Sequence, residues 1–169
     1  MGFGTVLVSE YDTRFPGKSL RLLRALRLYY RDPGFRVIAL TRACVSGSRM
    51  NQRRRYAKKL LLHYGVTVSP HAVIGQGLRM EHYAGIVIGR GAVIGDHCLL
   101  YQQVTLGQKN EQYPTLGNHV TVYPGAKIIG GIRIGSDVTV GANAVVLHDV
   151  PDGAVVAGVP ARIIGEASV

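Results

Sequence analysis

The chain has 169 residues and a formal net charge of +10; it contains no Trp, and 7% of its residues are aromatic. That length suits one domain with a substantial core, to which a small appendage can be attached. Two cysteines, Cys44 and Cys98, are too few for a disulfide framework, so we expect a reducing, cytosolic setting. Residues 1–8 are too short and uncharged for a signal peptide, and no apolar run approaches a membrane span.

The charge is divided unevenly along the chain. Residues 1–66 hold fourteen Lys or Arg residues and three acids, a balance of +11. Residues 67–169 hold six Lys or Arg residues and seven acids, a balance of −1. The basic character therefore belongs to the N-terminal part alone.

The N-terminal part is predicted to be helical after a short arm. Residues 2–17 include Pro16 and are expected to form an irregular arm. A first helix is predicted over residues 18–30, with Ser19 as its cap, and the Pro-Gly pair at 33–34 ends it.

Two further helices are predicted over residues 35–45 and 51–64, on either side of a Ser-Gly-Ser break at 46–48. These basic amphipathic helices have three interpretations: a solvated polar cap on the structure that follows, a contact with anionic lipid, or a nucleic-acid surface. We favour the cap. Contact at the inner face of a membrane comes next, and nucleic acid last, because no aromatic residues interleave with the charges.

Residues 67–153 follow a period of six, which is typical of the hexapeptide parallel β-helix, where three hexads close one triangular coil. A β-sandwich is the alternative, and the number of hexads in register argues against it. We therefore predict a mainly β fold, with residues 1–66 as a helical region and residues 154–169 as a tail packed on the β-helix. Aliphatic residues return at Val68, Ile74, Met80, Ile88, Ile94, Leu100, Leu106, Leu116, Val122, Ile128, Ile134, Val140 and Val146. Small or β-branched residues return at Ala72, Ala84, Ala92, Cys98, Val104, Val120, Ala126, Ile132, Val138, Ala144 and Val150.

Two interruptions break this rhythm. One is placed at residues 85–87, just after His82, and the other is the polar loop at residues 108–115. Insertions in a solenoid gather on its working face, so we expect His82 and the loop to share a face.

Three segments of the repeat resemble motifs of the hexapeptide-repeat acyltransferases, and within them the serine acetyltransferase-like group. They are EHYAGIVIG at 81–89, QVTLG at 103–107 and AGVPAR at 157–162, and RDPGF at 31–35 looks like the family's segment before the repeat. The resemblance covers residues 31–165. It implies a left-handed β-helix, a homotrimer, and acetyl-CoA bound in the groove between neighbouring prisms.

Acetyl transfer to a hydroxyl needs a base to take the hydroxyl proton, and His suits that role because its pKa lies near working pH. His82 matches the family's catalytic histidine, and a solvent-facing turn histidine is the alternative. The family's partner aspartate aligns with Thr67, so we expect the orienting acid to come from Glu81, from a neighbouring chain, or from no residue at all. The remaining histidines are interpreted as surface residues.

The acceptor is predicted from the loop. The family's serine-binding Arg-His pair aligns with Gln112 and Tyr113, so a cation for the serine carboxylate is missing there, whereas amide and phenol groups suit sugar hydroxyls. We therefore predict an acetyl-CoA-dependent O-acetyltransferase acting on a sugar or polysaccharide precursor. A serine O-acetyltransferase is the second prediction, and a non-catalytic scaffold or nucleic-acid-binding protein is the third.

The resemblance also assigns residues to coenzyme A. Small side chains would let pantetheine lie flat on the prism, although repeat packing explains them equally well, and the two cations would meet phosphates. No metal is predicted, because a zinc site would need His97 and His119, whose spacing is poor. The residues assigned to coenzyme A are Gly107, Ala126, Lys127, Gly141, Ala142, Ala161 and Arg162.

Overall fold

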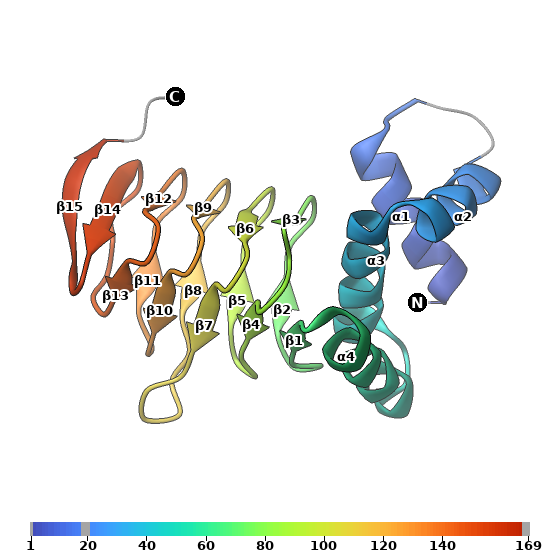
Figure 1. Cartoon of the computed structure of the whole chain (residues 1–169), viewed down its shortest axis with the longest axis horizontal. Coiled ribbons are helices and arrows are strands. Elements are labelled where there is room, and N and C mark those ends of the chain that lie inside the picture. The colour runs from blue at the N-terminus through green and yellow to red at the C-terminus, as the bar shows by residue number, and fades with distance from the viewer. Residues whose placement is uncertain (1, 18–20, 167–169) are drawn as a thin grey trace.

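The computed structural model describes residues 2–17 and 21–166, and places four helices at one end of a prism of short strands (Figure 1). The helices are α1 (Phe3–Arg14), α2 (Arg21–Arg31), α3 (Pro33–Ser46) and α4 (Met50–Tyr64). In the part of the chain that is described, no helix combines the length and apolar character needed to cross a bilayer.

Residues 3–14 form a helix, so the prediction of an irregular arm is wrong. The sequence signal is weak because Gly2 supplies no capping side chain and the apolar residues follow no clear helical period. Burial of Val6, Leu7 and Tyr11 stabilises α1, which packs on α2 and α3. Tertiary contacts thus override a weak local preference.

The other helices are confirmed with small shifts at their ends. The Asp-Pro pair that ends α2 also starts α3, because the Asp32 carboxylate accepts a hydrogen bond from the Phe35 backbone N–H at 3.1 Å and Pro33 occupies the first turn. Gly65 ends α4 in the left-handed conformation, with φ of 62°. The predicted cap Ser19 lies outside the described residues.

The remainder of the chain folds as a parallel β-helix, which confirms the predicted fold class. One sheet has the order β1-β4-β7-β10-β13, a second the order β11-β8-β5-β2, and a third the order β15-β14-β12-β9-β6-β3. Each of the first four coils contributes one strand to each sheet, whereas the last coil joins the second sheet only through a bridge between Val150 and Ile134. Only β15 runs antiparallel to its neighbour. The strands are β1 (Thr67–Val68), β2 (Val73–Ile74), β3 (Arg79–Glu81), β4 (Val87–Ile88), β5 (Val93–Ile94), β6 (Leu99–Tyr101), β7 (Thr105–Gly107), β8 (Thr115–Leu116), β9 (Thr121–Val122), β10 (Lys127–Ile129), β11 (Arg133–Ile134), β12 (Thr139–Val140), β13 (Val145–Val146), β14 (Ala154–Gly158) and β15 (Ala161–Glu166).

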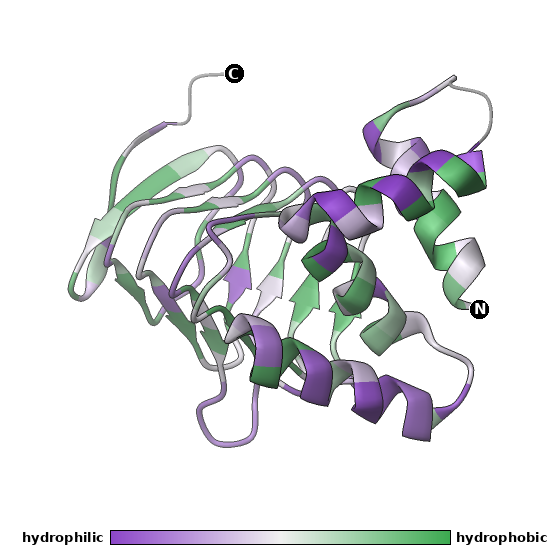
Figure 2. Cartoon of the chain, turned by 45° about the vertical axis from the view of Figure 1, so that its right-hand side comes forward, coloured by the Kyte–Doolittle hydropathy of each residue, from purple (hydrophilic) through white to green (hydrophobic). Residues whose placement is uncertain are grey.

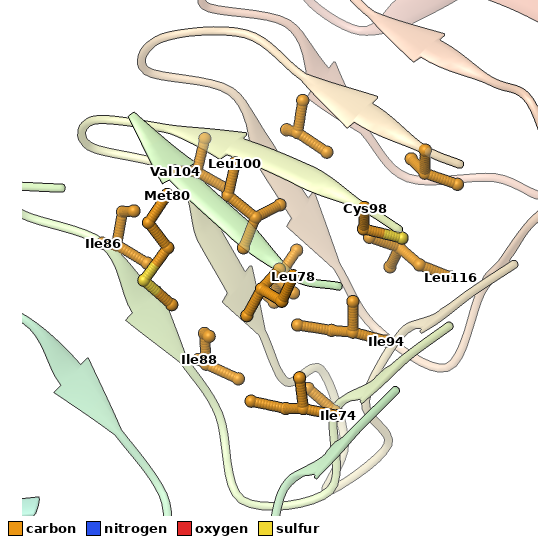
Figure 3. Close-up of a cluster of buried hydrophobic side chains, with 14 of the residues drawn as sticks. Ile74, Leu78, Met80, Ile86, Ile88, Ile94, Cys98, Leu100, Val104 and Leu116 are labelled. Carbon is orange, nitrogen blue, oxygen red and sulfur yellow. The ribbon is translucent and has the colours of Figure 1, made fainter. Parts of the chain in front are cut away.

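All thirteen aliphatic positions of the hexad pattern are buried. Figure 3 shows part of the stack, in which Ile74, Ile94 and Leu116 occupy equivalent places in successive coils. Fully burying such a side chain is worth about 1.5–3 kcal/mol, so the stack is the main source of stability in this part. The small positions are buried as predicted, except that Ile132 is half-buried and Ala84 is exposed. Ile86 takes the inward place that the pattern gave to Ala84.

Arg42 of α3 joins the helical end to the first coil. Its guanidinium donates to Glu10 Oε1 at 2.7 Å, to the Ile74 carbonyl at 2.6 Å and to the Gly75 carbonyl at 2.5 Å. The Arg42 and Glu10 side chains are only 14% and 8% exposed. This buried arginine therefore holds α1 and α3 over the first coil, and so positions the helices beside β3.

Candidate active site

His82 protrudes from the β-helix because the chain carries two extra residues at this point. Glu81 is in register with Tyr101 of the next coil, and the Gln103 N–H donates to the Ala84 carbonyl at 2.9 Å. Tyr101 and Gln102 are consecutive, whereas their equivalents in the preceding coil, Glu81 and Ala84, are separated by two residues, His82 and Tyr83. The interruption is therefore at residues 82–83, earlier than the hexad pattern suggested, and it shifts the inward position away from Ala84.

The backbone at His82 is left-handed, with φ of 50°, and its side chain is exposed. Seven other non-glycine residues at turns of the described chain share this conformation, so it is a feature of the β-helix turns and does not by itself mark a functional residue. The insertion thus presents an imidazole to solvent at the point where the third sheet turns into the first, which we call the His82 corner.

The His82 corner continues through the coils that follow. Backbone hydrogen bonds align Ala84 with Gln102, and then Pro124 with Ala142, up one edge of the prism. The turn from β14 to β15 brings the C-terminal hairpin to the end of this edge, where Gly158 pairs with Ala161. Most of the residues assigned to coenzyme A lie along this edge: Lys127, Gly141, Ala142, Ala161 and Arg162.

The cations and small residues at this edge differ in what they offer a ligand. The Lys127 ammonium donates to the Gln103 and Gly125 carbonyls at 2.6 and 2.8 Å, which ties it to the corner. Arg162 is exposed, and its only hydrogen bond in the described structure is to the neighbouring Ala161 carbonyl. Ala126 is completely buried, so its side chain belongs to the core.

The polar loop lies at a different corner, where the first sheet turns into the second between β7 and β8. It folds as a tight hairpin with a bridge between Lys109 and Gln112. The Tyr113 ring packs over Gly89 so closely that a Cβ added there would lie 2.6 Å from Tyr113 Cε1. Gly107, Gln112 and Tyr113 are therefore separated from His82 by the width of the first sheet. The prediction that His82 and the loop share a face is wrong for a single chain.

A cleft that the sequence did not reveal lies between α1, the start of α3 and β3, with a volume of about 460 Å³. Its lining carries charges of both signs: Arg14 is 3.2 Å from Asp32, and Arg79 is 2.7 Å from Glu81. Glu81 lines the cleft and immediately precedes His82. The cleft combines residues from distant parts of the sequence, so no local motif marks it.

The other histidines and the thiols offer no second reactive centre. The rings of His97 and His119 stack with centroids 5.5 Å apart, and His119 Nδ1 lies 3.3 Å from Asp137 Oδ1. Among the described residues, no three His, Cys, Asp or Glu side chains are grouped to hold a metal ion. Burial raises the pKa of the Cys44 thiol to about 11 and also raises the pKa of Cys98, so both stay protonated and unreactive near neutral pH.

Known proteins match both the repeat and the whole arrangement. The family model "Bacterial transferase hexapeptide (six repeats)" matches residues 113–148. A serine acetyltransferase of Synechococcus elongatus is 43% identical over 141 residues, which cover 78% of this chain and 57% of that protein. The crystal structure of serine acetyltransferase from Brucella abortus strain S19 is 31% identical, with a TM-score of 0.76, and the match covers 98% of this chain and 69% of that one. This chain belongs to the hexapeptide-repeat acyltransferases, in the serine acetyltransferase-like group.

The relatives of this serine acetyltransferase-like chain correct the predicted acceptor. The matched proteins described above are serine acetyltransferases, and their names offer no support for a sugar or polysaccharide acceptor. Gln112 and Tyr113 leave the loop without a cation for a carboxylate, but Arg14 and Arg79 place guanidinium groups in the cleft beside Glu81. A second Brucella abortus structure, 30% identical over 98% of this chain and 68% of that one with a TM-score of 0.76, is a complex with coenzyme A.

Proposed function

We propose that this chain is a serine O-acetyltransferase that uses acetyl-CoA as donor and His82 as general base. The observation that carries the proposal is the cleft of mixed charge that ends at Glu81, next to the exposed His82. Support also comes from the names of the relatives. The chain spans 57% of the length of the Synechococcus protein, so activity, substrate and assembly are all part of the proposal.

Serine is a zwitterion, and the cleft offers groups of both signs to it. A carboxylate from Asp32 or Glu81 would hold the ammonium group, while the guanidinium of Arg14 or Arg79 would hold the carboxylate. Without substrate, Arg14 is paired with Asp32 and Arg79 with Glu81. Serine would replace these ion pairs by forming its own with the same side chains. Such a site needs no cation in the loop, which is why Gln112 and Tyr113 do not exclude serine.

The chemical step follows from the position of His82. Its neutral imidazole takes the proton of the serine hydroxyl while the oxygen attacks the thioester carbonyl carbon. The tetrahedral intermediate then collapses, the carbon–sulfur bond breaks, and the departing thiolate takes a proton from the imidazolium. The donor would lie along the His82 corner, where Gly141 and Ala142 present little bulk and Arg162 has free donors for phosphate.

The separation of the two corners supports an assembly with sites between copies. Within one chain the first sheet lies between His82 and the loop residues Gln112 and Tyr113. A homotrimer of prisms packed side by side would bring the loop corner of one copy against the His82 corner of the next. If the loop of one copy completes the site of the next, Tyr113→Ala alone should be inactive, as His82→Ala should be, and the two variants can then be mixed under conditions where subunits exchange. Mixed assemblies would recover part of the activity if two copies build each site, and would recover none if one chain suffices.

The activity itself is tested by following thiol release from acetyl-CoA with serine, threonine, homoserine and a panel of sugars as acceptors. Serine is expected to give the highest kcat/KM, and His82→Ala to lower kcat by about 10²–10⁴-fold while leaving the thermal midpoint unchanged, because the side chain is exposed. Thiol release with a sugar but not with serine would contradict the assignment of serine as the acceptor. An unchanged kcat in His82→Ala would contradict the role of His82 as general base.

A further inference from the structure

We propose that the outer surface of α2 and α4 docks on a bilayer that contains anionic phospholipid, with lipid phosphates seated in a hollow between the C-terminal ends of these two helices. The hollow is a second cavity, separate from the cleft beside Glu81, and the proposed acetyl transfer makes no use of it. Lipid binding at the hollow can therefore be tested independently of the proposed catalytic activity.

The hollow is lined by aromatic and cationic residues alone. Its volume is about 570 Å³, and none of the lining residues in the described part of the chain is acidic. The lining consists of three tyrosines and three nitrogen bases: Tyr29, Tyr30, Tyr64, Arg36, Lys59 and His63. Phenol hydroxyls, an ammonium and a guanidinium are all donors to phosphate oxygens.

Arg36 prepares the hollow for an anion by neutralising the helix end that borders it. The last carbonyls of a helix carry partial negative charge, which would repel a phosphate. The Arg36 guanidinium takes up two of them, donating to the Tyr29 carbonyl at 2.7 Å and to the Tyr30 carbonyl at 2.6 Å, and it also hydrogen-bonds the Tyr64 side chain. Lys59 and His63, one turn apart on α4, make no hydrogen bond or ion pair within the described structure, so the Lys59 charge and the His63 ring N–H remain available to a ligand.

The two helices that border the hollow also carry exposed apolar side chains, most of them outside its lining. On α2 the side chains of Leu23 and Tyr30 are 66% and 73% exposed, and on α4 those of Leu61 and Leu62 are 52% and 64% exposed. Neither helix contains a single acid. Figure 2 shows α4 lying across the outside of the molecule with most of its ribbon in the hydrophilic colour. Basic helices with exposed leucines and tyrosines are typical of segments that lie in a bilayer interface.

Charge and chemistry select the bilayer over other partners. Residues 1–66 carry a balance of +11, so a second copy of this face would be repelled, whereas an anionic surface would be attracted. Tyr29, Tyr30 and Tyr64 do interleave with the cations here, so the reason given from the sequence against nucleic acid is wrong. Nucleic acid would satisfy the cations and tyrosines but would leave the exposed leucines in water. A membrane with anionic headgroups covers both kinds of side chain at once, through phosphates for the cations and acyl chains for the leucines.

The test is co-sedimentation of the full chain with two kinds of vesicle, one of phosphatidylcholine alone and one with about a third phosphatidylglycerol. The partition coefficient is expected to be at least about tenfold higher on the anionic vesicles and to fall as salt is raised. Replacing Lys59→Gln together with His63→Gln should lower it about fivefold, and Leu61→Ser together with Leu62→Ser by a similar factor. Arg133→Gln and Val73→Ser, exposed positions on the β-helix, are the matched controls and should change nothing.

Several results would overturn this proposal. Equal binding to both vesicles, no binding to either, or an equal loss in the control variants would each show that this surface does not dock on anionic lipid. Inorganic phosphate that perturbs the His63 resonance without any vesicle binding would indicate a site for a free anion instead. Tighter binding to a single-stranded oligonucleotide, or a change of oligomer size in the leucine variants, would point to the other classes of partner. Melting curves that match the unmodified chain keep each variant interpretable.

Discussion

The β-helix is stabilised by repeated burial of equivalent side chains, whereas the helical end is stabilised by contacts that differ from helix to helix. This difference determines how much of each part can be predicted from the sequence. In the β-helix every coil meets nearly the same surroundings, so thirteen aliphatic side chains repeat and all are buried. Each helix packs against a different neighbour: α3 and α4 contact β1, β2 and β3, and the buried Arg42 of α3 adds hydrogen bonds to two carbonyls of the first coil. The repetitive part supplies the frame, the exposed His82 and one wall of the cleft, whereas the irregular part supplies the opposite wall and most of the positive charge.

The junction is where this comparison predicts the largest loss of stability. Arg42→Ala would leave Glu10 buried without its partner and two carbonyls without a donor, and breaking a buried ion pair in this way costs about 3–5 kcal/mol. Urea denaturation with the fluorescence of the tyrosines would measure it, with the exposed Arg133→Ala as control. A loss below about 1 kcal/mol would show that the helices are held by other contacts.

Leu100 in the β-helix and Leu22 in α2 give a matched pair from the two regions. Leu100 is completely buried and Leu22 is 48% exposed. Leu100→Ala should lower the free energy of unfolding by about 2–5 kcal/mol. Leu22→Ala should change it by less than about 0.5 kcal/mol. Chemical denaturation of both variants measures the difference. Equal losses would contradict the view that the stacked aliphatics carry the stability.

A substitution in the cleft tests whether the helical end contributes to substrate binding. Asp32→Asn removes a charge that would hold the serine ammonium, yet asparagine still caps α3, so the fold should persist. The KM for serine is expected to rise about tenfold, equivalent to about 1.4 kcal/mol, while the KM for acetyl-CoA stays unchanged. Steady-state kinetics with each substrate varied in turn would check this. Equal changes in both constants would argue for a general loss of structure.

The smallest expected effect concerns alkaline pH. Burial raises the pKa of Cys44 from its ordinary value of 9.0 to about 11, so the unfolded chain loses this proton first as pH rises. The native state then binds more protons than the unfolded state, and stability falls as pH rises from about 9 to about 11. Below that window the thiol has no effect. Cys44→Ala should flatten this part of the curve of midpoint against pH, and an unchanged slope would assign it to other groups.

Several features could be predicted from the sequence because they repeat or sit in a recognisable motif. The inward positions from Val68 to Val146 follow from period alone. The segment around His82 marks it as the candidate base, and that role stays a prediction. What could not be predicted depends on contacts between distant segments. The cleft needs Arg14 and Asp32 beside β3, and α1 forms because its apolar side chains are buried by other helices. The distance between the two corners depends on which sheet each strand joins.

The predicted sugar acceptor is wrong for the same reason: contacts between distant segments could not be predicted from the sequence. The absence of a cation at Gln112 and Tyr113 is a correct observation about the loop, but the proposed serine site takes its cations from the cleft. Arg14 and Arg79 lie in the cleft next to Glu81, far from the loop in the sequence. A counter-ion can enter a site from any segment that the fold brings near, so its absence from one motif does not exclude a charged substrate.

The most direct test of the central claim is the identity of the product. The chain would be incubated with acetyl-CoA and an equal mixture of serine and sugar acceptors, and the acetylated products identified by mass spectrometry, with His82→Ala in parallel. O-acetylserine as the main product, reduced by about 10²–10⁴-fold in the variant, is the result expected here. An acetylated sugar as the main product, or O-acetylserine formed equally by both chains, would contradict the account.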